Sequence, residues 1–161
     1  MLPEFTADAV TAISPTALYK LGYKVTTKDS NGTKYWRYVK NASGGSLKVG
    51  QGTMIKDASV AWDADVSTTA ASHARFLGVA QAYTLNGTSS LFLDTYYGFV
   101  QCEGYGKVLG IAAGVAANSS LKCVAAGEFD AGVIGTNDLV AFNPVALAAG
   151  TVAGSAYIKS V

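Results

Sequence analysis

The pair Asn31-Gly32 stands between two runs of residues that favour extended backbone, and this arrangement is typical of a β-hairpin. Both residues tolerate a positive φ, which a two-residue turn between antiparallel strands requires. Residues 18–29, before the pair, alternate in character, and residues 34–40, after it, are rich in aromatic and β-branched side chains. We therefore predict antiparallel strands on either side of a turn at Asn31-Gly32.

The rest of the chain repeats this pattern. Asn86-Gly87 separates two further strand-like runs, and short apolar segments between residues 96 and 135 are divided by turns that contain glycine. The sequence has 18 glycines in 161 residues, and no stretch has the long 3.6-residue period of an amphipathic helix. We expect one all-β domain, a barrel or a sandwich, in which residues 63–74 form either a loop or a short helix.

The first residues differ from the others. Residues 1–18 carry apolar side chains that fit no regular period, so an N-terminal arm that is extended or partly helical is expected there. The predicted β domain then covers residues 19–161.

Residues 139–158 are uncharged, but Asn143-Pro144 interrupts them and Ala and Gly favour membrane insertion weakly. Two buried strands joined by a glycine turn are predicted there, with no membrane partner.

The charge content argues against several partners. Only 14% of the residues are charged, against roughly 25% in an average soluble domain, and the net charge is +1. The lysines form no basic stripe, so nucleic acid is not an expected partner. A surface with so little charge indicates either a face that is covered in an assembly or a monomer coated with Ser, Thr, Asn and Gly. The N-terminus has no secretory signal pattern, so we expect synthesis and folding to begin in a cytoplasm.

No motif dictates a reaction. The segment Gly104-Tyr105-Gly106-Lys107 lacks the spacing of a phosphate-binding loop, and we interpret it as a bulge or a hairpin turn. The one histidine, His73, forms a dyad with Cys102 only if the fold brings the two together. Two thiols, Cys102 and Cys123, with one histidine fall short of a zinc site, and both thiols are expected to be free and buried.

Pairs of carboxylates occur at Asp63 with Asp65 and at Glu128 with Asp130. Residues two apart share one face of a strand, so each pair is compatible with a cation site or with acid and base catalysis. Solvated loop acids are the simpler explanation for both pairs. We therefore expect no catalytic residue, no metal and no cofactor, and predict that the protein is not an enzyme.

Aromatic residues offer another possible surface. Alternation places Trp36 and Tyr38 on one face of the predicted strand, with Tyr35 and Arg37 on the other. One face belongs to the core. The other face is an interface, a sugar-stacking platform that includes Trp62, or a set of exposed rings.

Residues 35–132 resemble the head decoration, or cement, proteins of tailed bacteriophages. The similar segments are Tyr38–Lys40, Leu77–Gln81, Tyr97–Gln101, the Gly/Ala run of residues 110–117 and Val124–Gly127. The resemblance implies a small β-barrel or β-tulip-like protein with an extended N-terminal arm, often a homotrimer. It also implies a location on the outer capsid surface of the virion, where such proteins bind neighbouring subunits of the major capsid protein.

In that family a terminal arm commonly makes the contact with the capsid. The resemblance therefore implies capsid-contact roles for the apolar residues of the arm, Leu2, Phe5, Val10 and Ile13. If the arm is the clamp, deletion of residues 1–18 is expected to abolish binding to the shell and to leave the β domain folded. The alternative function is a carbohydrate-binding or host-adhesion module on the tail or head of a phage particle.

Overall fold

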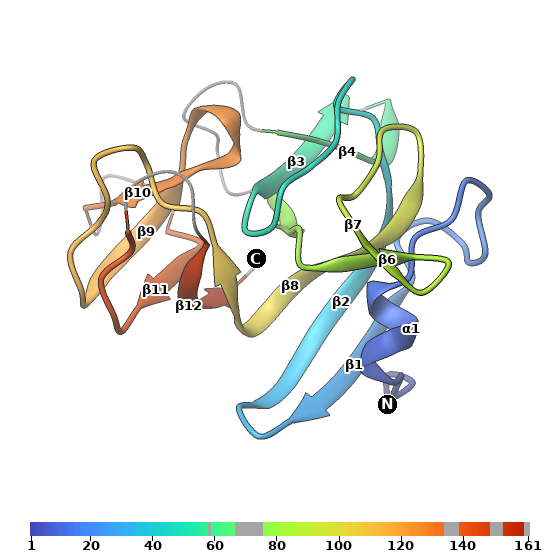
Figure 1. The fold of residues 1–161 in the computed structure, drawn as a ribbon, viewed down its shortest axis with the longest axis horizontal. Helices are drawn as coiled ribbons and strands as arrows, with labels where there is room; N and C mark the ends of the chain where they lie inside the picture. The colour runs from blue at the N-terminus through green and yellow to red at the C-terminus, as the bar shows by residue number, and fades with distance from the viewer. Residues whose placement is uncertain (58, 67–75, 134–138, 149–152, 160–161) are drawn as a thin grey trace.

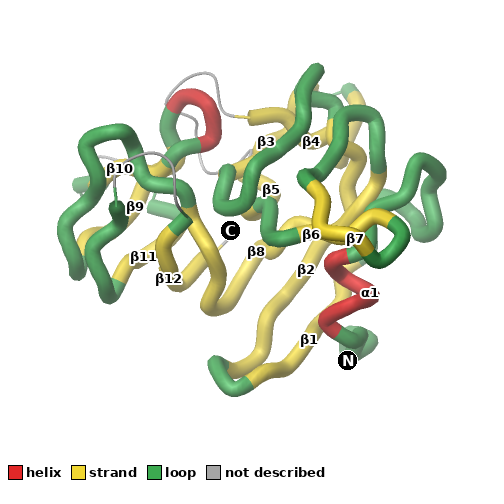
Figure 2. The backbone as a smooth tube through the Cα atoms, in the orientation of Figure 1, coloured by secondary structure: helices red, strands yellow, loops and turns green. Residues whose placement is uncertain are grey.

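A computed structural model describes residues 1–57, 59–66, 76–133, 139–148 and 153–159. Strands and the loops between them make up most of this part of the chain, which confirms the all-β prediction (Figures 1 and 2). The elements are α1 (Ala7–Thr11), β1 (Lys24–Asp29), β2 (Gly32–Asn41), β3 (Gly52–Asp57), β4 (Val60–Val66), β5 (Phe76–Val79), β6 (Tyr83–Leu85), β7 (Thr88–Ser90), β8 (Tyr97–Val108), β9 (Ser119–Cys123), the 3₁₀ turn η2 (Ala125–Gly127), β10 (Phe129–Ala131), β11 (Ala141–Asn143) and β12 (Gly154–Lys159). Among the described residues, no helix has the length and apolar character that crossing a membrane requires.

Both predicted hairpins form, with different turns. In the β6–β7 hairpin Leu85 pairs with Thr88, and Asn86 (φ 51°) and Gly87 (φ 78°) are the two turn residues, as predicted. In the β1–β2 hairpin Asp29 pairs with Gly32, so the turn residues are Ser30 and Asn31, one position earlier than predicted. Gly32 takes the positive φ there, at 103°. The Asp29 carboxylate accepts a hydrogen bond from the Asn31 N–H at 2.8 Å, which fixes this turn.

The first predicted strand is shorter than expected. Residues 18–23 belong to no strand. Residues 20–23 form a turn, in which the Tyr23 N–H donates to the Lys20 carbonyl at 3.0 Å, and β1 begins only at Lys24. Gly22 has a φ of 83°, and a Cβ at this position would lie 2.6 Å from the Trp62 ring. A residue with a side chain could not continue the strand there, and alternation alone does not report that contact.

Strands β2, β4, β3, β5 and β8 pair in this order, and β2 also pairs with β8, so the sheet closes into a ring. Every strand of the ring contributes a side chain to one apolar cluster: Val39, Ile55, Ala64, Leu77 and Val100. Because these side chains come from all sides, they fill the interior of the ring. The interior therefore holds a packed core.

Strand β8 also belongs to a second group of strands. Beyond the ring its C-terminal half pairs with β12, and β11, β9 and β10 follow in order. A bridge from Phe129 in β10 to Gly110, just past the end of β8, brings the last strand back to the first. Figure 1 shows β9–β12 grouped on the left of the molecule, with β8 leading into them. This C-terminal half has its own core, which includes Val108, Leu121, Phe129 and Ile158.

The predicted strands of residues 139–158 are present as β11 and β12. They pair antiparallel, with Ala141 opposite Ile158 and Phe142 opposite Tyr157. Part of the segment that joins them, residues 149–152, lies outside the described residues. Residues 63–66 of the undecided segment belong to β4, and the rest of it, residues 67–74, also lies outside them.

The segment Gly104-Tyr105-Gly106 is part of β8, so the hairpin alternative is wrong. The register of β8 against β2 shifts between Tyr35, opposite Glu103, and Trp36, opposite Gln101. Cys102 is thus the extra residue of a bulge. A Cβ at residue 106 would lie 2.4 Å from the amide oxygen of the buried Gln101, and one at residue 104 would lie 2.8 Å from the Thr33 carbonyl. The two glycines let the strand pass close to its neighbours.

Candidate functional site

The N-terminal segment lies against the β domain of its own chain. The Phe5 N–H donates to the Thr26 carbonyl at 2.7 Å, and the Thr26 N–H donates to the Pro3 carbonyl at 2.9 Å, so residues 3–5 extend the sheet at the β1 edge. Helix α1 follows, with the Thr6 hydroxyl accepting from the Ala9 N–H at its N-terminus. Further bonds join Ile13 to β6 and Ser14 to β8.

The four residues proposed for capsid contact divide into two pairs. Val10 and Ile13 are buried: Val10 packs with Val25 and Phe99, and Ile13 packs with Phe92 and the ring core. Val10 has no accessible surface and Ile13 is 6% exposed, so in this structure both side chains belong to the core and offer no surface for the expected capsid contact. Leu2 is 40% exposed and Phe5 is half-buried, and both remain accessible.

Aromatic side chains beside Phe5 continue this accessible surface. The Phe5 ring centroid lies 5.5 Å from that of Tyr19 and 6.4 Å from that of Tyr23, and the Tyr19 and Tyr23 rings stack at 5.8 Å. Tyr19 also meets the buried rings of Tyr38 and Phe99 at 5.2 and 5.5 Å. The exposed rings are therefore fixed to the core and do not hang free in solvent.

We call Leu2, Phe5, Leu18, Tyr19 and Tyr23 the N-terminal face. Leu18, Tyr19 and Tyr23 are exposed, and Leu2 and Tyr23 line one open cavity of about 890 Å³ together with residues of β1 and β2. Sequence reasoning did not assign Leu18, Tyr19 or Tyr23 to a contact surface, because it placed them in a regular strand. Their signal was the concentration of apolar and aromatic residues directly after the arm.

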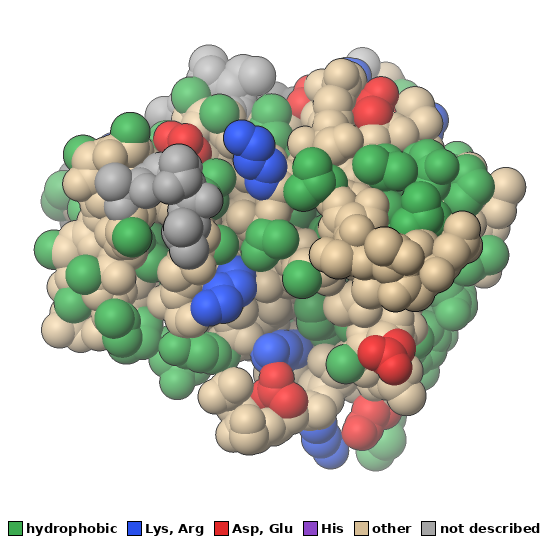
Figure 3. All heavy atoms as spheres, viewed as in Figure 1, with side chains coloured by type: hydrophobic (Ala, Val, Ile, Leu, Met, Phe, Trp, Pro, Cys, Tyr) green, Lys and Arg blue, Asp and Glu red, His purple; other side chains and the backbone are tan. Residues whose placement is uncertain are grey.

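The chemistry of this face is apolar contact. Near it Lys28 pairs with Glu4 at 3.6 Å, and the exposed Lys20 and Lys24 follow Tyr19 and Tyr23 in the sequence. At the nearby hairpin Lys34 pairs with Asp29 at 2.7 Å, and this hydrogen bond, followed by that from Asn31, lowers the pKa of the Asp29 carboxyl. On the side of the molecule shown in Figure 3, charged side chains are few and are interspersed with hydrophobic and uncharged groups.

The two cysteines are free and buried, as predicted. The Cys102 thiol donates to the Tyr35 carbonyl at 3.3 Å, and burial raises its pKa, with the Arg37 charge opposing in part. Burial raises the pKa of Cys123 to about 12. His73, the proposed partner of Cys102, lies outside the described residues. A buried thiol with a raised pKa is the opposite of an activated nucleophile.

We expect both thiols to resist alkylation in the native protein at pH 8. Burial and the low thiolate fraction should make the reaction with iodoacetamide at least about a hundredfold slower than in protein unfolded by guanidinium chloride. Mass spectrometry of timed samples measures both rates. Modification of native Cys102 within minutes would show that the site opens and that its thiol is reactive.

The members of each carboxylate pair differ in their surroundings. Asp63 faces a cavity, whereas the Asp65 carboxylate accepts from the Val66 N–H at 2.8 Å. The Asp130 carboxylate similarly accepts from the Ala131 N–H at 2.7 Å, and Glu128 ends the η2 turn. Within the described part of the chain, no group of three or more His, Cys, Asp or Glu side chains is placed to hold a metal ion.

The aromatic residues considered for sugar stacking lie mostly inside the protein. Trp36 and Tyr38 are buried in one apolar cluster with Val10 of α1 and Phe5, and the Trp36 indole N–H donates to the Thr27 hydroxyl at 2.9 Å. Trp62 is half-buried, and the Arg37 guanidinium lies over its ring at 4.7 Å. The ring face of Trp62 that Arg37 covers is closed to a sugar.

Comparison of the chain with models of known protein families and with curated proteins gave no match.

Proposed function

We propose that the protein is a structural virion protein, a decoration protein that binds the outer surface of a phage head and stabilises contacts between major capsid subunits. The observation that supports this proposal is the N-terminal face, an exposed aromatic surface that packs on the buried rings of Tyr38 and Phe99. Apolar groups that are held in place lose little conformational entropy on binding, so such a surface is suited to docking. The low charge of the chain is consistent with a face that is covered in an assembly.

The closed ring supports the finer part of the fold proposal. A ring of β2, β4, β3, β5 and β8 with a filled interior is what a small β-barrel needs. In this proposal three copies associate as a homotrimer, and each copy presents its N-terminal face to the shell. Modest contacts made by many copies at once then add up to a large stabilisation of the capsid.

The test is co-sedimentation with empty, undecorated capsid shells, combined with light scattering of the protein alone. The wild-type protein is expected to have three times the mass of the chain and to bind the shells saturably. A monomer in light scattering would overturn the trimer. A protein that never pellets with shells would overturn the decoration function.

We expect the substitution Leu18→Asp to weaken shell binding roughly tenfold or more, because it places a charge in an apolar contact. The Leu18 side chain is 64% exposed, and its backbone N–H keeps its bond to the Tyr38 hydroxyl, so the fold should be unaffected. Val145→Asp is the matched control, since Val145 is 62% exposed and lies in the C-terminal half. Equal binding by the two variants would exclude the N-terminal face as the contact.

A further inference from the structure

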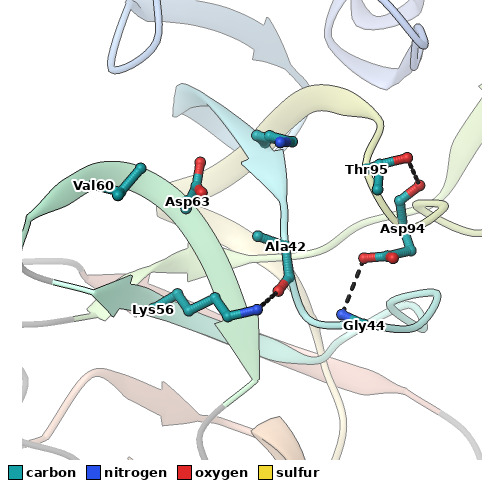
Figure 4. Close-up of a pocket in the computed structure, with 8 residues that line it drawn as sticks. Ala42, Gly44, Lys56, Val60, Asp63, Asp94 and Thr95 are labelled. Atoms are coloured by element: carbon teal, nitrogen blue, oxygen red, sulfur yellow. Dashed lines mark hydrogen bonds between the residues drawn. The ribbon is translucent and has the colours of Figure 1, made fainter.

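An open cavity of about 580 Å³ lies where β2 and β4 run side by side, on a part of the molecule that the decoration proposal does not use. Figure 4 shows side chains from β3 and β4 on one side and the Asp94-Thr95 turn on the other, with residues 42–44 between them. The side chains used below are Lys40, Lys56, Val60, Asp63, Asp94 and Thr95, all of which line this cavity. Its volume is within the usual range for small-ligand sites.

Lys40 and Asp63 are opposite each other in the parallel β2–β4 pair, and both are half-buried. They line the same cavity, yet neither belongs to an ion pair among the described residues, where Lys28–Glu4 and Lys34–Asp29 are the pairs that form. Both side chains line the cavity without pairing with each other, so they are available to a polar molecule that enters it.

The other charged groups are fixed at the cavity wall. The Lys56 ammonium donates to the Ala42 carbonyl, and the Asp94 carboxylate accepts from the Gly44 N–H at 3.0 Å (Figure 4). The described lining thus offers the ammonium groups of Lys40 and Lys56 and the carboxylates of Asp63 and Asp94. These charges cancel, and the lining offers both hydrogen-bond donors and acceptors.

Two non-glycine residues with a positive φ lie at or next to this cavity. Thr95 has a φ of 65° and Trp62, next to Asp63, has a φ of 75°, a conformation that is unfavourable for β-branched and bulky residues. Strain of this kind costs roughly 1–3 kcal/mol per residue and is found most often at functional sites. The Thr95 N–H donates to the Asn41 carbonyl at 2.8 Å, which holds the strained turn against β2.

The buried Asn41 side chain makes the wall rigid. Its amide N–H groups donate to the Gly45 carbonyl at 2.9 Å and the Phe92 carbonyl at 2.8 Å, and its oxygen accepts from the Ser43 hydroxyl at 2.7 Å. Two loop segments, one with Ser43 and Gly45 and the other with Phe92, are thereby joined to the end of β2. The cavity is organised before any ligand arrives, which lowers the entropy cost of binding.

We propose that this cavity binds a neutral, hydroxyl-rich ligand, namely a sugar unit of a glycan. A hydroxyl group donates to a carboxylate and accepts from an ammonium at the same time, so it matches the alternating Asp and Lys groups. A ligand with a net charge would meet a lining that also carries groups of its own sign. Val60, which is exposed at the rim, offers an apolar wall to the C–H face of a sugar ring. This recognition needs no stacking on Trp36 or Trp62.

The test is titration of ¹⁵N-labelled full-length protein with D-glucose, D-galactose and N-acetyl-D-glucosamine, followed by amide chemical shifts. Saturable shifts at Gly44 and Thr95, with a Kd on the order of millimolar, are expected for at least one neutral sugar. Asp63→Asn should weaken this binding roughly tenfold or more, because it removes a charged acceptor. Asp65→Asn is the matched control on the same strand, and should bind as the wild type does.

Other outcomes would overturn the proposal. Shifts that appear with D-glucuronate or L-serine and with none of the neutral sugars would assign the cavity to charged ligands. Absence of saturable shifts up to about 100 mM sugar, or unchanged binding by Asp63→Asn, would remove the site altogether. These results are independent of shell binding, which depends on the N-terminal face.

Discussion

A chain that lacks residues 1–14 is expected to unfold at a much lower temperature than the full-length protein. The deletion removes the buried side chains of Val10 and Ile13, and with them the backbone bonds from Phe5 to Thr26 and from Ile13 to Thr84. Removing a large buried side chain costs about 2–5 kcal/mol, so the loss should reach at least about 4 kcal/mol. That corresponds to a fall in Tm of roughly 10 °C or more for a domain of this size.

Thermal unfolding followed by circular dichroism measures this difference. Deletion of residues 1 and 2 alone is the control, because both side chains are exposed and Pro3 keeps its bond to Thr26. That shorter deletion should change the free energy of unfolding by less than about 0.5 kcal/mol. If the 1–14 deletion unfolds at the temperature of the full chain, the N-terminal segment is a detachable arm after all.

This prediction replaces the expectation that an arm of residues 1–18 can be removed while the β domain stays folded. The described contacts do not support that expectation, since Val10 and Ile13 contribute to two different apolar clusters. If the truncated protein failed to bind shells, either unfolding or the loss of a contact could be the cause. Single substitutions on the N-terminal face, such as Leu18→Asp, are therefore the better test of function.

Phe99→Ala is expected to lower the free energy of unfolding by about 3–5 kcal/mol. Phe99 is 1% exposed, and its ring meets those of Phe5, Tyr19 and Tyr38 at 5.9, 5.5 and 4.9 Å. Its carbonyl also accepts from the buried Tyr83 hydroxyl at 2.7 Å, so a shift of β8 would disturb a second core residue. The cavity left by the ring would lie beneath the N-terminal face itself.

Guanidinium chloride titration of Phe99→Ala against Phe142→Ala tests this prediction. Phe142 also lies on a strand but is 41% exposed, and its loss should cost less than about 1 kcal/mol. The comparison separates burial from residue type. Equal midpoints for the two variants would contradict the central place of Phe99 in the core.

Turn chemistry was the most informative part of the sequence. Asn86-Gly87 forms the turn that its residues favour, because both take a positive φ. Asn31-Gly32 correctly predicted a hairpin but not its register. The turn lies one residue earlier, where the Asp29 carboxylate accepts a hydrogen bond from the Asn31 N–H. Local propensity cannot distinguish these cases, because the deciding contact comes from a neighbouring side chain.

The candidate sites were harder to predict, because they depend on contacts between distant segments. Alternation correctly placed Trp36 and Tyr38 on one face, but it could not show that this face packs with Val10 and Phe5 of the N-terminal segment. Similarly, Lys40 and Asp63 are 23 positions apart, and the parallel pairing of β2 with β4 brings them together. The packing of the N-terminal segment could not be predicted for the same reason, since Val10 and Ile13 fit no period within their own segment.

The bulge at Cys102 determines which side chains of β8 face the core on either side of it, in the ring and in the C-terminal half. On the ring side Val100 points into the ring core, and beyond the bulge Val108 points into the C-terminal core. Because side chains alternate along a strand, a change of one residue in this stretch would turn every later side chain to the opposite face. An insertion or deletion of a single residue between the two cores would therefore disrupt one of them. The surface loops of the chain are free of this constraint.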